Sequence, residues 1–149
     1  MAKQLSREYK SAGVGVIVLD PFHSSDWQAD VVTADSEHFL NVLWDSQSCA
    51  CFIDEAADAV GRYDDAMRQT ATRGRHWGHN MHYISQRGSD LNKTVRDQCD
   101  FLFMFKLSYK DRQTLAQEFD KDELLEELDR YAYVKCDRYN VVEKRTVSP

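Results

Sequence analysis

The sequence predicts an α/β protein with a mainly parallel sheet, flanking helices and a C-terminal β-hairpin. Short apolar runs alternate with amphipathic segments along the chain, as expected when strands alternate with covering helices. The first run, "VGVIVLDP" at residues 14–21, is a near-continuous β-branched run, which is typical of a strand buried on both faces. The chain has 149 residues and is 42% hydrophobic, so we predict one domain over residues 1–149.

The first half of the chain predicts two helices and two strands. Leu5, Tyr9 and Ala12 recur at helical spacing and Gly13 follows, which indicates a helix closed by a glycine cap. The next strand ends at Pro21. Asp35 or Ser36 can then cap a second amphipathic helix over residues 35–46. The small apolar run "CACFI" at residues 49–53 is the second strand.

The second half continues the alternation and ends in a hairpin. Helical patterns cover residues 55–60 and 64–75 with a break near Gly61, and the strand "NMHYISQ" follows Gly78. Phe101, Phe103 and Phe105 belong to the apolar run "DFLFMFK", where we expect them in the core rather than on a base-stacking surface. The remaining expected elements are helices over 108–119 and 121–131 and a hairpin over 131–147 that turns around 137–140.

Polar residues follow three of the predicted strands. Asp20 follows the first strand, Asp54 and Glu55 follow the second, and Ser85, Gln86 and Arg87 lie at the end of the third. The carboxyl ends of parallel strands share one edge of a sheet, and ligands of such folds bind beyond that edge. We therefore expect the acidic pair and the glutamine to face one site.

The acidic pair after an apolar strand is the pattern by which nucleotide hydrolases hold magnesium. Asp54 would hold Mg²⁺ through water, and Glu55 would orient or activate the attacking water. Gln86 has the donor and acceptor needed to contact a phosphate or that water. Arg73 and Arg75 would act as arginine fingers toward a neighbouring subunit. The alternative is that the acids favour the start of a helix and the arginines its end, with no ligand involved.

Charge and cysteine content restrict the class of protein. Net charge is −6, but residues 68–96 carry six Lys or Arg against one acid, so this segment is +5 and the rest is −11. That distribution suits phosphate binding at one edge or a solvated basic face. The four cysteines resemble buried side chains in a reducing compartment, and the chain has no apolar run long enough for a membrane span, so we expect a cytoplasmic protein. A zinc site could be built only from Cys49, Cys51, His76, His79 and His82, and the spacing of these residues matches no common zinc-binding pattern.

Taken in order, these features resemble the core of the HerA/FtsK group of P-loop ATPases, from Met1 to about Lys144. The matching segments are "VIVLDPFHSSDW", "CFIDEA" as the Walker B strand, "RGRHWG", "YISQR" and "CDFLFMFKL". This group includes DNA translocases, conjugation pumps, and packaging and Zot-like ATPases of bacteriophages. The resemblance implies a RecA/FtsK-type P-loop fold that binds ATP and Mg²⁺ and forms a hexameric ring around double-stranded DNA. It also implies that Asp54, Gln86 and Arg87 bind nucleotide.

One motif of that group is absent. The phosphate loop G-x-x-x-x-G-K-[ST] has no match: before the only Lys-Ser pair, Lys10 and Ser11, its glycine positions hold Gln4 and Tyr9. We therefore expect a chain short of its N-terminal Walker A strand and loop, with weakened ATP affinity. Two alternatives stay open. One is a nucleotide-free module that binds DNA or a partner; the other is a metal-dependent nuclease using Asp20, Asp54 and Glu55.

Overall fold

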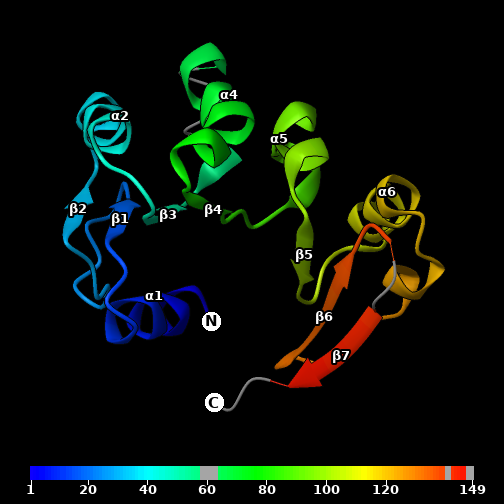
Figure 1. Cartoon of the computed structure of the whole chain (residues 1–149). Helices are drawn as coiled ribbons and strands as arrows, with labels where there is room; N and C mark the ends of the chain where they lie inside the picture. The colour runs from blue at the N-terminus through cyan, green and yellow to red at the C-terminus, as the bar shows by residue number, and fades with distance from the viewer. Residues whose placement is uncertain (58–63, 140–141, 147–149) are drawn as a thin grey trace. The chain divides into compact units, whose positions relative to one another are not determined.

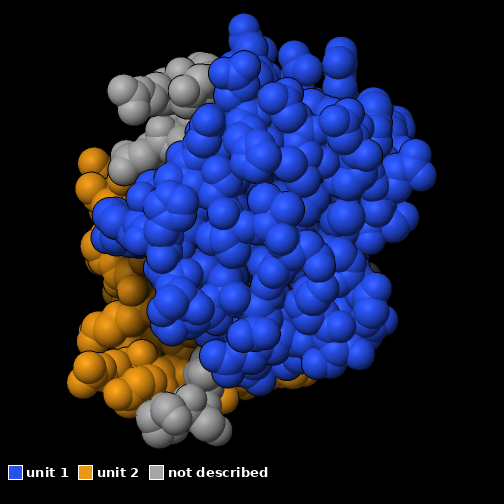
Figure 2. All heavy atoms as spheres, turned by 90° about the vertical axis from the view of Figure 1, so that its left-hand side faces the viewer, with its two compact units in different colours: residues 1–86, 91–97 blue, residues 87–90, 98–149 orange. Residues whose placement is uncertain are grey.

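The computed structural model describes residues 1–57, 64–139 and 142–146. These residues form two compact units, which Figure 2 shows in different colours. Unit 1 contains residues 1–86 and 91–97, and unit 2 contains residues 87–90 and 98–149. That the whole chain acts as a single domain over residues 1–149 stays a prediction.

Unit 1 is built on a four-stranded parallel sheet, which confirms the expected α/β architecture. The strand order is β2-β1-β3-β4, and Phe52 of β3 lies between Val18 of β1 and His82 of β4. Strand β2 was not predicted, because three residues are too short to carry a periodic signal. The strands are β1 (Val16–Leu19), β2 (Val31–Thr33), β3 (Ala50–Ile53) and β4 (Asn80–Tyr83).

Helices cover both faces of this sheet. In Figure 1, α1 lies on one side of the strands, and α2 and α4 lie on the other. Helix α1 ends as predicted, because Gly13 has φ +78° and its N–H donates to the carbonyl of Lys10. Asp35 caps α2 by accepting from two backbone N–H groups of its first turn. The helices of unit 1 are α1 (Ala2–Ser11), α2 (Ser36–Asp45), α4 (Asp64–Arg73), the 3₁₀ turn η1 (Gly74–Trp77) and α5 (Lys93–Gln98).

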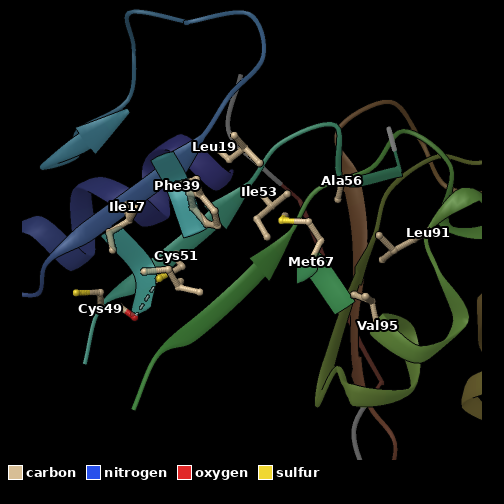
Figure 3. Close-up of a cluster of buried hydrophobic side chains, with 11 residues drawn as sticks. Ile17, Leu19, Phe39, Cys49, Cys51, Ile53, Ala56, Met67, Leu91 and Val95 are labelled. Atoms are coloured by element: carbon tan, nitrogen blue, oxygen red, sulfur yellow. Dashed lines mark hydrogen bonds between the residues drawn. The ribbon is translucent and has the colours of Figure 1, made fainter. Parts of the chain in front are cut away.

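Two apolar clusters hold this unit together, one on each face. Figure 3 shows the cluster on the α2 and α4 face, where Phe39, Ile53 and Met67 have no exposed surface. On the opposite face, Phe52 packs with Trp27 and with Tyr9 of α1. Full burial of one such side chain stabilises a fold by about 1.5–3 kcal/mol. Strands β1 and β3 both contribute buried side chains to the two clusters.

Unit 2 is a three-stranded antiparallel sheet with one covered face. The apolar run "DFLFMFK" forms β5, which lies outside the parallel sheet: it pairs antiparallel with β6, and Met104 lies opposite Val134. The six-residue strand β6 gives β5 a full-length partner. The elements are η2 (Gly88–Asp90), β5 (Phe101–Met104), α6 (Tyr109–Phe119), η3 (Asp122–Leu125), β6 (Ala132–Asp137) and β7 (Val142–Thr146).

Other predictions for this half differ from the structure. Phe101, Phe103 and Phe105 are 54%, 38% and 37% exposed, because Leu102 and Met104 take the inner face of β5. The helix expected over 121–131 is only the turn η3. Its acids at positions 122 and 126, and at 123 and 127, would repel each other at helical spacing. The hairpin is confirmed, although residue 140 of its turn lies outside the described residues. Residues 58–60 of the helix expected over 55–60, and the break expected near Gly61, also lie outside them.

Candidate functional site

The carboxyl ends of the unit 1 strands form one continuous edge. Backbone hydrogen bonds extend the sheet past the strands: Asp20 N–H donates to Thr33, Asp54 N–H to Leu19, and Ala56 N–H to Ile84, at 2.8–2.9 Å. This ladder places the residues that follow β1, β3 and β4 side by side. We call Asp20, Asp54, Glu55 and Gln86 the rim.

Two rim side chains are in direct contact. The amide Nε2 of Gln86 donates to Oε1 of Glu55 at 2.8 Å, although the residues are 31 positions apart in the chain. The Gln86 side chain is exposed and Glu55 is half-buried, so this pair is accessible to solvent at the sheet edge. The structure thus brings the glutamate and the glutamine together as the strand-end argument predicts.

Glu55 has an unusual backbone. Its φ is +48°, in the left-handed region that costs a non-glycine residue roughly 1–2 kcal/mol. Two hydrogen bonds hold the conformation: Glu55 N–H donates to Oδ1 of Asp54 at 3.0 Å, and Ala56 N–H donates to Ile84 at 2.8 Å. Backbone strain of this kind is concentrated at functional sites, where surrounding contacts maintain it.

Asp54 carries a charge in an unfavourable position. Burial raises the pKa of its carboxyl, and the nearby charges of Asp20 and Glu55 raise it further. The hydrogen bond from Glu55 N–H and the charge of Lys3 lower it in part. A cation next to Asp54 would remove this penalty, so the environment suits a carboxylate that binds a positive ligand.

Asp20 has a structural role. It is fully buried, and its two oxygens accept from Phe22 N–H, Ser24 N–H and the indole N–H of Trp27 at 2.8–2.9 Å. Burial alone would raise the pKa of Asp20, but these hydrogen bonds outweigh burial and lower it. Because Asp20 has no exposed surface and its two oxygens accept three hydrogen bonds from the protein, it is poorly placed as the metal ligand of the nuclease alternative.

Lys3 is a rim-side cation that the sequence argument missed. Lys10 near the end of α1 pairs with Asp30, which accepts from Val16 N–H at the start of β1. The first turn of α1 therefore lies toward the carboxyl ends of the strands, where the charge of Lys3 acts on Asp54. Its ammonium lies 3.3 Å from Asp26 and 5.8 Å from the ring of Trp27. No side chain caps the first turn of α1. The direction of α1 relative to β1 was the signal that could have identified this residue.

The predicted arginine fingers lie at the other edge of the sheet. Arg73 ends α4 and Arg75 lies in η1, immediately before β4 begins. The carbonyl of Trp77 accepts from Ser48 N–H at 2.9 Å, just before β3 begins, which fixes η1 at the amino ends of the strands. The four residues of β4, about 3.3 Å each, separate these arginines from Gln86. Within one chain, they therefore do not reach the rim.

Arg87 and part of the basic segment lie close to carboxylates. Arg87 belongs to unit 2, where its Nε lies 3.8 Å from Asp90 and 3.7 Å from Asp111. Arg68 pairs with Asp65, and Lys93 pairs with Asp97, both acids just outside the +5 segment. Flanking carboxylates therefore neutralise part of the positive charge that the sequence predicted.

The histidines near the cysteines have other roles than zinc binding. His79 is buried; its Nδ1 accepts from Cys49 N–H at 3.1 Å, and its Nε2 then donates to the carbonyl of Leu43 at 2.9 Å. His82 stacks on Phe52 with ring centroids 4.5 Å apart, and burial lowers its pKa to about 4. Within the described residues, no group of three or more His, Cys, Asp or Glu side chains is placed to hold a metal.

No protein-family model matches the sequence, and no curated protein sequence matches it. The structure does match solved structures. The genome packaging NTPase B204 from Sulfolobus turreted icosahedral virus 2, in complex with AMPPCP, has a TM-score of 0.78 and 18% identity over 97% of this chain and 88% of that chain. The fold matches that of packaging ATPases.

Two further structures extend this likeness. The DNA-packaging ATPase B204 from Sulfolobus turreted icosahedral virus has a TM-score of 0.76 and 17% identity, covering 99% of this chain and 90% of that chain. VirB4 of Thermoanaerobacter pseudethanolicus has a TM-score of 0.60 and 15% identity, covering 85% of this chain and 42% of that chain. The likeness confirms the predicted P-loop NTPase-like fold class. Among the described residues, no helix has the length and apolar character to cross a membrane.

Proposed function

We propose that this chain binds Mg²⁺ and ATP at the rim and hydrolyses ATP as part of a DNA-translocating or genome-packaging protein of a virus or mobile element. The hydrogen bond between Glu55 and Gln86 carries the proposal, because it joins an acid and an amide from neighbouring parallel strands at the ligand-binding edge. The fold likeness supports it. The B204 structures include complexes with AMPPCP and with ATP-gammaS.

Asp54 fits a magnesium ion. Mg²⁺ keeps several waters and needs only one or two protein carboxylates together with phosphate oxygens, so a larger cluster of acids is not required. The partly buried Asp54 carboxylate, with its raised pKa, gains from a neighbouring cation. When bound, the ion would neutralise charge on the phosphates.

The other rim groups provide positioning and proton transfer. The Glu55 carboxylate orients the attacking water and accepts its proton. The Gln86 amide donates to a phosphate oxygen or to that water, while its bond to Glu55 keeps both groups at the same edge. The first turn of α1 and the ammonium of Lys3 supply positive potential on the Asp54 side, which favours phosphate.

The arginines complete the site only in an assembly. Arg73 and Arg75 are exposed at the amino edge of the sheet, and each would reach the rim of a neighbouring copy rather than its own. A homo-oligomeric ring, with hexameric symmetry as the HerA/FtsK resemblance implies, would make that contact around double-stranded DNA in the host cytoplasm. Arg87 would contribute to nucleotide binding from the next position after Gln86.

A comparison of two Glu-to-Gln variants tests this function. We expect calorimetry to show Mg·ATP binding to the wild-type chain and to Glu55→Gln. Phosphate release should fall at least about 100-fold in Glu55→Gln, because the proton acceptor is lost. The matched control is Glu8→Gln, which changes an exposed acid on α1 that contacts Gln4. The proposal fails if wild-type chain does not bind Mg·ATP, or if Glu55→Gln and Glu8→Gln hydrolyse ATP equally fast.

The second candidate is a nucleotide-free DNA-binding or interaction module with an ATPase-like fold. The sequence observation that favours it is the missing G-x-x-x-x-G-K-[ST] motif. Fluorescence anisotropy with labelled duplex DNA separates the two candidates. DNA binding that is lost in the Arg73→Ala, Arg75→Ala double variant, by a chain that binds no ATP, would support this module over the ATPase.

A further inference from the structure

The two edges of the unit 2 sheet differ in composition. Strand β6 lies between β5 and β7, so β5 and β7 are the edge strands of this sheet within the described residues (Figure 1). Natural edge strands are protected by charges or proline, because their outer N–H and C=O groups can otherwise pair with another strand. β7 carries three consecutive charges at Glu143, Lys144 and Arg145. Residues 101–105, which we call the β5 segment, contain neither a charge nor a proline.

The outer face of the β5 segment is aromatic. Phe101, Phe103 and Phe105 are each more than a third exposed. Strand β6 contacts their rings from one side: Nζ of Lys135 lies 5.1 Å from the centroid of the Phe101 ring, and the ring centroids of Tyr133 and Phe105 are 5.4 Å apart. On the other side, the sheet order places no strand of the described chain beside them. Contiguous exposed apolar surface of this kind marks an interaction site.

The charges on this face favour a protein partner over nucleic acid. In the strand register, Lys135 and Arg145 lie on the same face as the phenylalanines, and so do the acids Asp137 and Glu143. Arg145 also forms an ion pair with Glu143. Binding of single-stranded nucleic acid by stacking needs a positively charged groove as well as aromatic side chains. A face whose cations and acids are matched in number suits a protein surface instead.

The sequence around the β5 segment is complementary to itself in the antiparallel direction. When Phe103 lies opposite Phe103 of a second copy, Phe101 lies opposite Phe105. In the same register, Asp100 lies opposite Lys106 at both ends of the segment. Directly opposite residues of an antiparallel pair lie on the same face, and like charges placed opposite each other are destabilising. This register joins the aromatic surfaces of the two copies and places opposite charges together at each end.

We propose that two copies of this chain associate by antiparallel pairing of their β5 segments about a two-fold axis at Phe103. The product is one continuous antiparallel sheet with the strand order β7-β6-β5-β5-β6-β7, and its edges are the two charged β7 strands. Association stops at two copies, because the same surface of each copy is used up in the contact. The contact lies within residues 100–106, all in unit 2, so it is independent of the proposed nucleotide site.

Sedimentation velocity of the full chain tests the dimer. The paired segment is short, so the contact belongs to the small, transient class, and we expect a reversible dimer at about 100 μM chain. Phe103→Lys should weaken association about tenfold or more, because it places like charges opposite each other on the two-fold axis. The matched control is Phe22→Lys, which changes a phenylalanine of unit 1 that is 74% exposed and should leave association unchanged.

Three outcomes of this experiment would overturn the proposal. The first is a wild-type chain that stays monomeric at about 100 μM, which would leave the β5 edge to a different partner. The second is association that survives Phe103→Lys, or that Phe22→Lys weakens equally. The third is growth into larger species without a discrete dimer, which would show open-ended association in place of a closed pair.

Cysteine cross-linking tests the register, and it decides the question if Phe103→Lys does not fold. Directly opposite Cβ atoms of an antiparallel pair lie about 4.5–5.5 Å apart, so Phe103→Cys should form a disulfide-linked dimer under mild oxidation. Phe105→Cys is the control, because the two copies of residue 105 would be offset by about 13 Å along the strands. A mixture of Phe101→Cys and Phe105→Cys should cross-link again.

The wild-type chain, with its four native cysteines, gives the background level of cross-linking. Phe103→Cys that does not exceed this level would refute the pairing. Cross-linking of Phe105→Cys alone, as efficient as that of Phe103→Cys, would refute the two-fold axis at Phe103.

Discussion

Replacing Asp20 by alanine tests the conclusion that this acid is structural. The substitution removes the acceptor of three hydrogen bonds, from Phe22 N–H, Ser24 N–H and the indole of Trp27. The indole has no obvious substitute partner, because the Trp27 side chain is only 6% exposed. The two backbone donors lie in a turn where water can replace the carboxylate in part.

The expected loss follows from these environments. A buried donor left without a partner costs about 1–3 kcal/mol, so the indole contributes about 2 kcal/mol and the partly accessible backbone groups about 0.5 kcal/mol each. We therefore expect Asp20→Ala to lower the free energy of unfolding of unit 1 by about 3 kcal/mol. Asp20→Asn keeps one acceptor oxygen, and it should lose about half as much.

Urea unfolding followed by tryptophan fluorescence measures this loss. The three tryptophans, Trp27, Trp44 and Trp77, all lie in unit 1, so the signal reports that unit alone. Asp26→Ala is the control, because Asp26 pairs with Lys3 in an exposed ion pair, which contributes less than about 1 kcal/mol. If Asp20→Ala and Asp26→Ala lose the same small amount, the structural role assigned to Asp20 is wrong.

Three further predictions follow from the same contacts. Asp54→Asn should raise the thermal midpoint of unfolding at pH 7, because burial disfavours the charged form of Asp54 and raises its pKa. This gain should shrink as the pH falls through that pKa, because the wild-type Asp54 carboxyl is then also neutral. Gly78→Ala should lower the urea-derived unfolding free energy by about 1–2 kcal/mol, since Gly78 has φ +73° and a Cβ would lie 3.0 Å from Oγ of Ser48; no loss would contradict that geometry. Cys51 and Cys99 should resist a thiol reagent at pH 8 until the chain unfolds. Burial raises the pKa of both thiols, to about 11 for Cys99, so little reactive thiolate is present. Rapid labelling of the native chain would contradict this prediction.

The strand-end pattern predicted the main feature of the candidate site. Parallel strands deliver their following residues to one edge whatever the loops do, so the contact between Glu55 and Gln86 follows from strand order and direction. The role of Asp20 does not follow in this way. It depends on how residues 21–27 fold back to place the Trp27 indole, which has no periodic signal.

The errors in unit 2 arise because strand pairing is not visible in the local sequence. Every side chain from Phe101 to Phe105 is apolar, so the run hides the two-residue alternation that decides which face is buried. The pairing of β5 with β6 sets that alternation, and pairing is a long-range property. Likewise, charge counted along residues 68–96 missed Asp65 and Asp97, which lie outside the counted window but pair with Arg68 and Lys93.

The double passage of the chain between units makes each unit dependent on a discontinuous stretch of gene. A fragment cut after Gln86 would lose Leu91 and Val95, which are 8% and 0% exposed in the core of unit 1. Both residues belong to the same buried cluster as Met67 and Ile53 in Figure 3, so the cut would leave this cluster incomplete. Recombination at this junction would therefore leave the core of unit 1 incompletely filled. The gene segments for the two units must be recombined and expressed together.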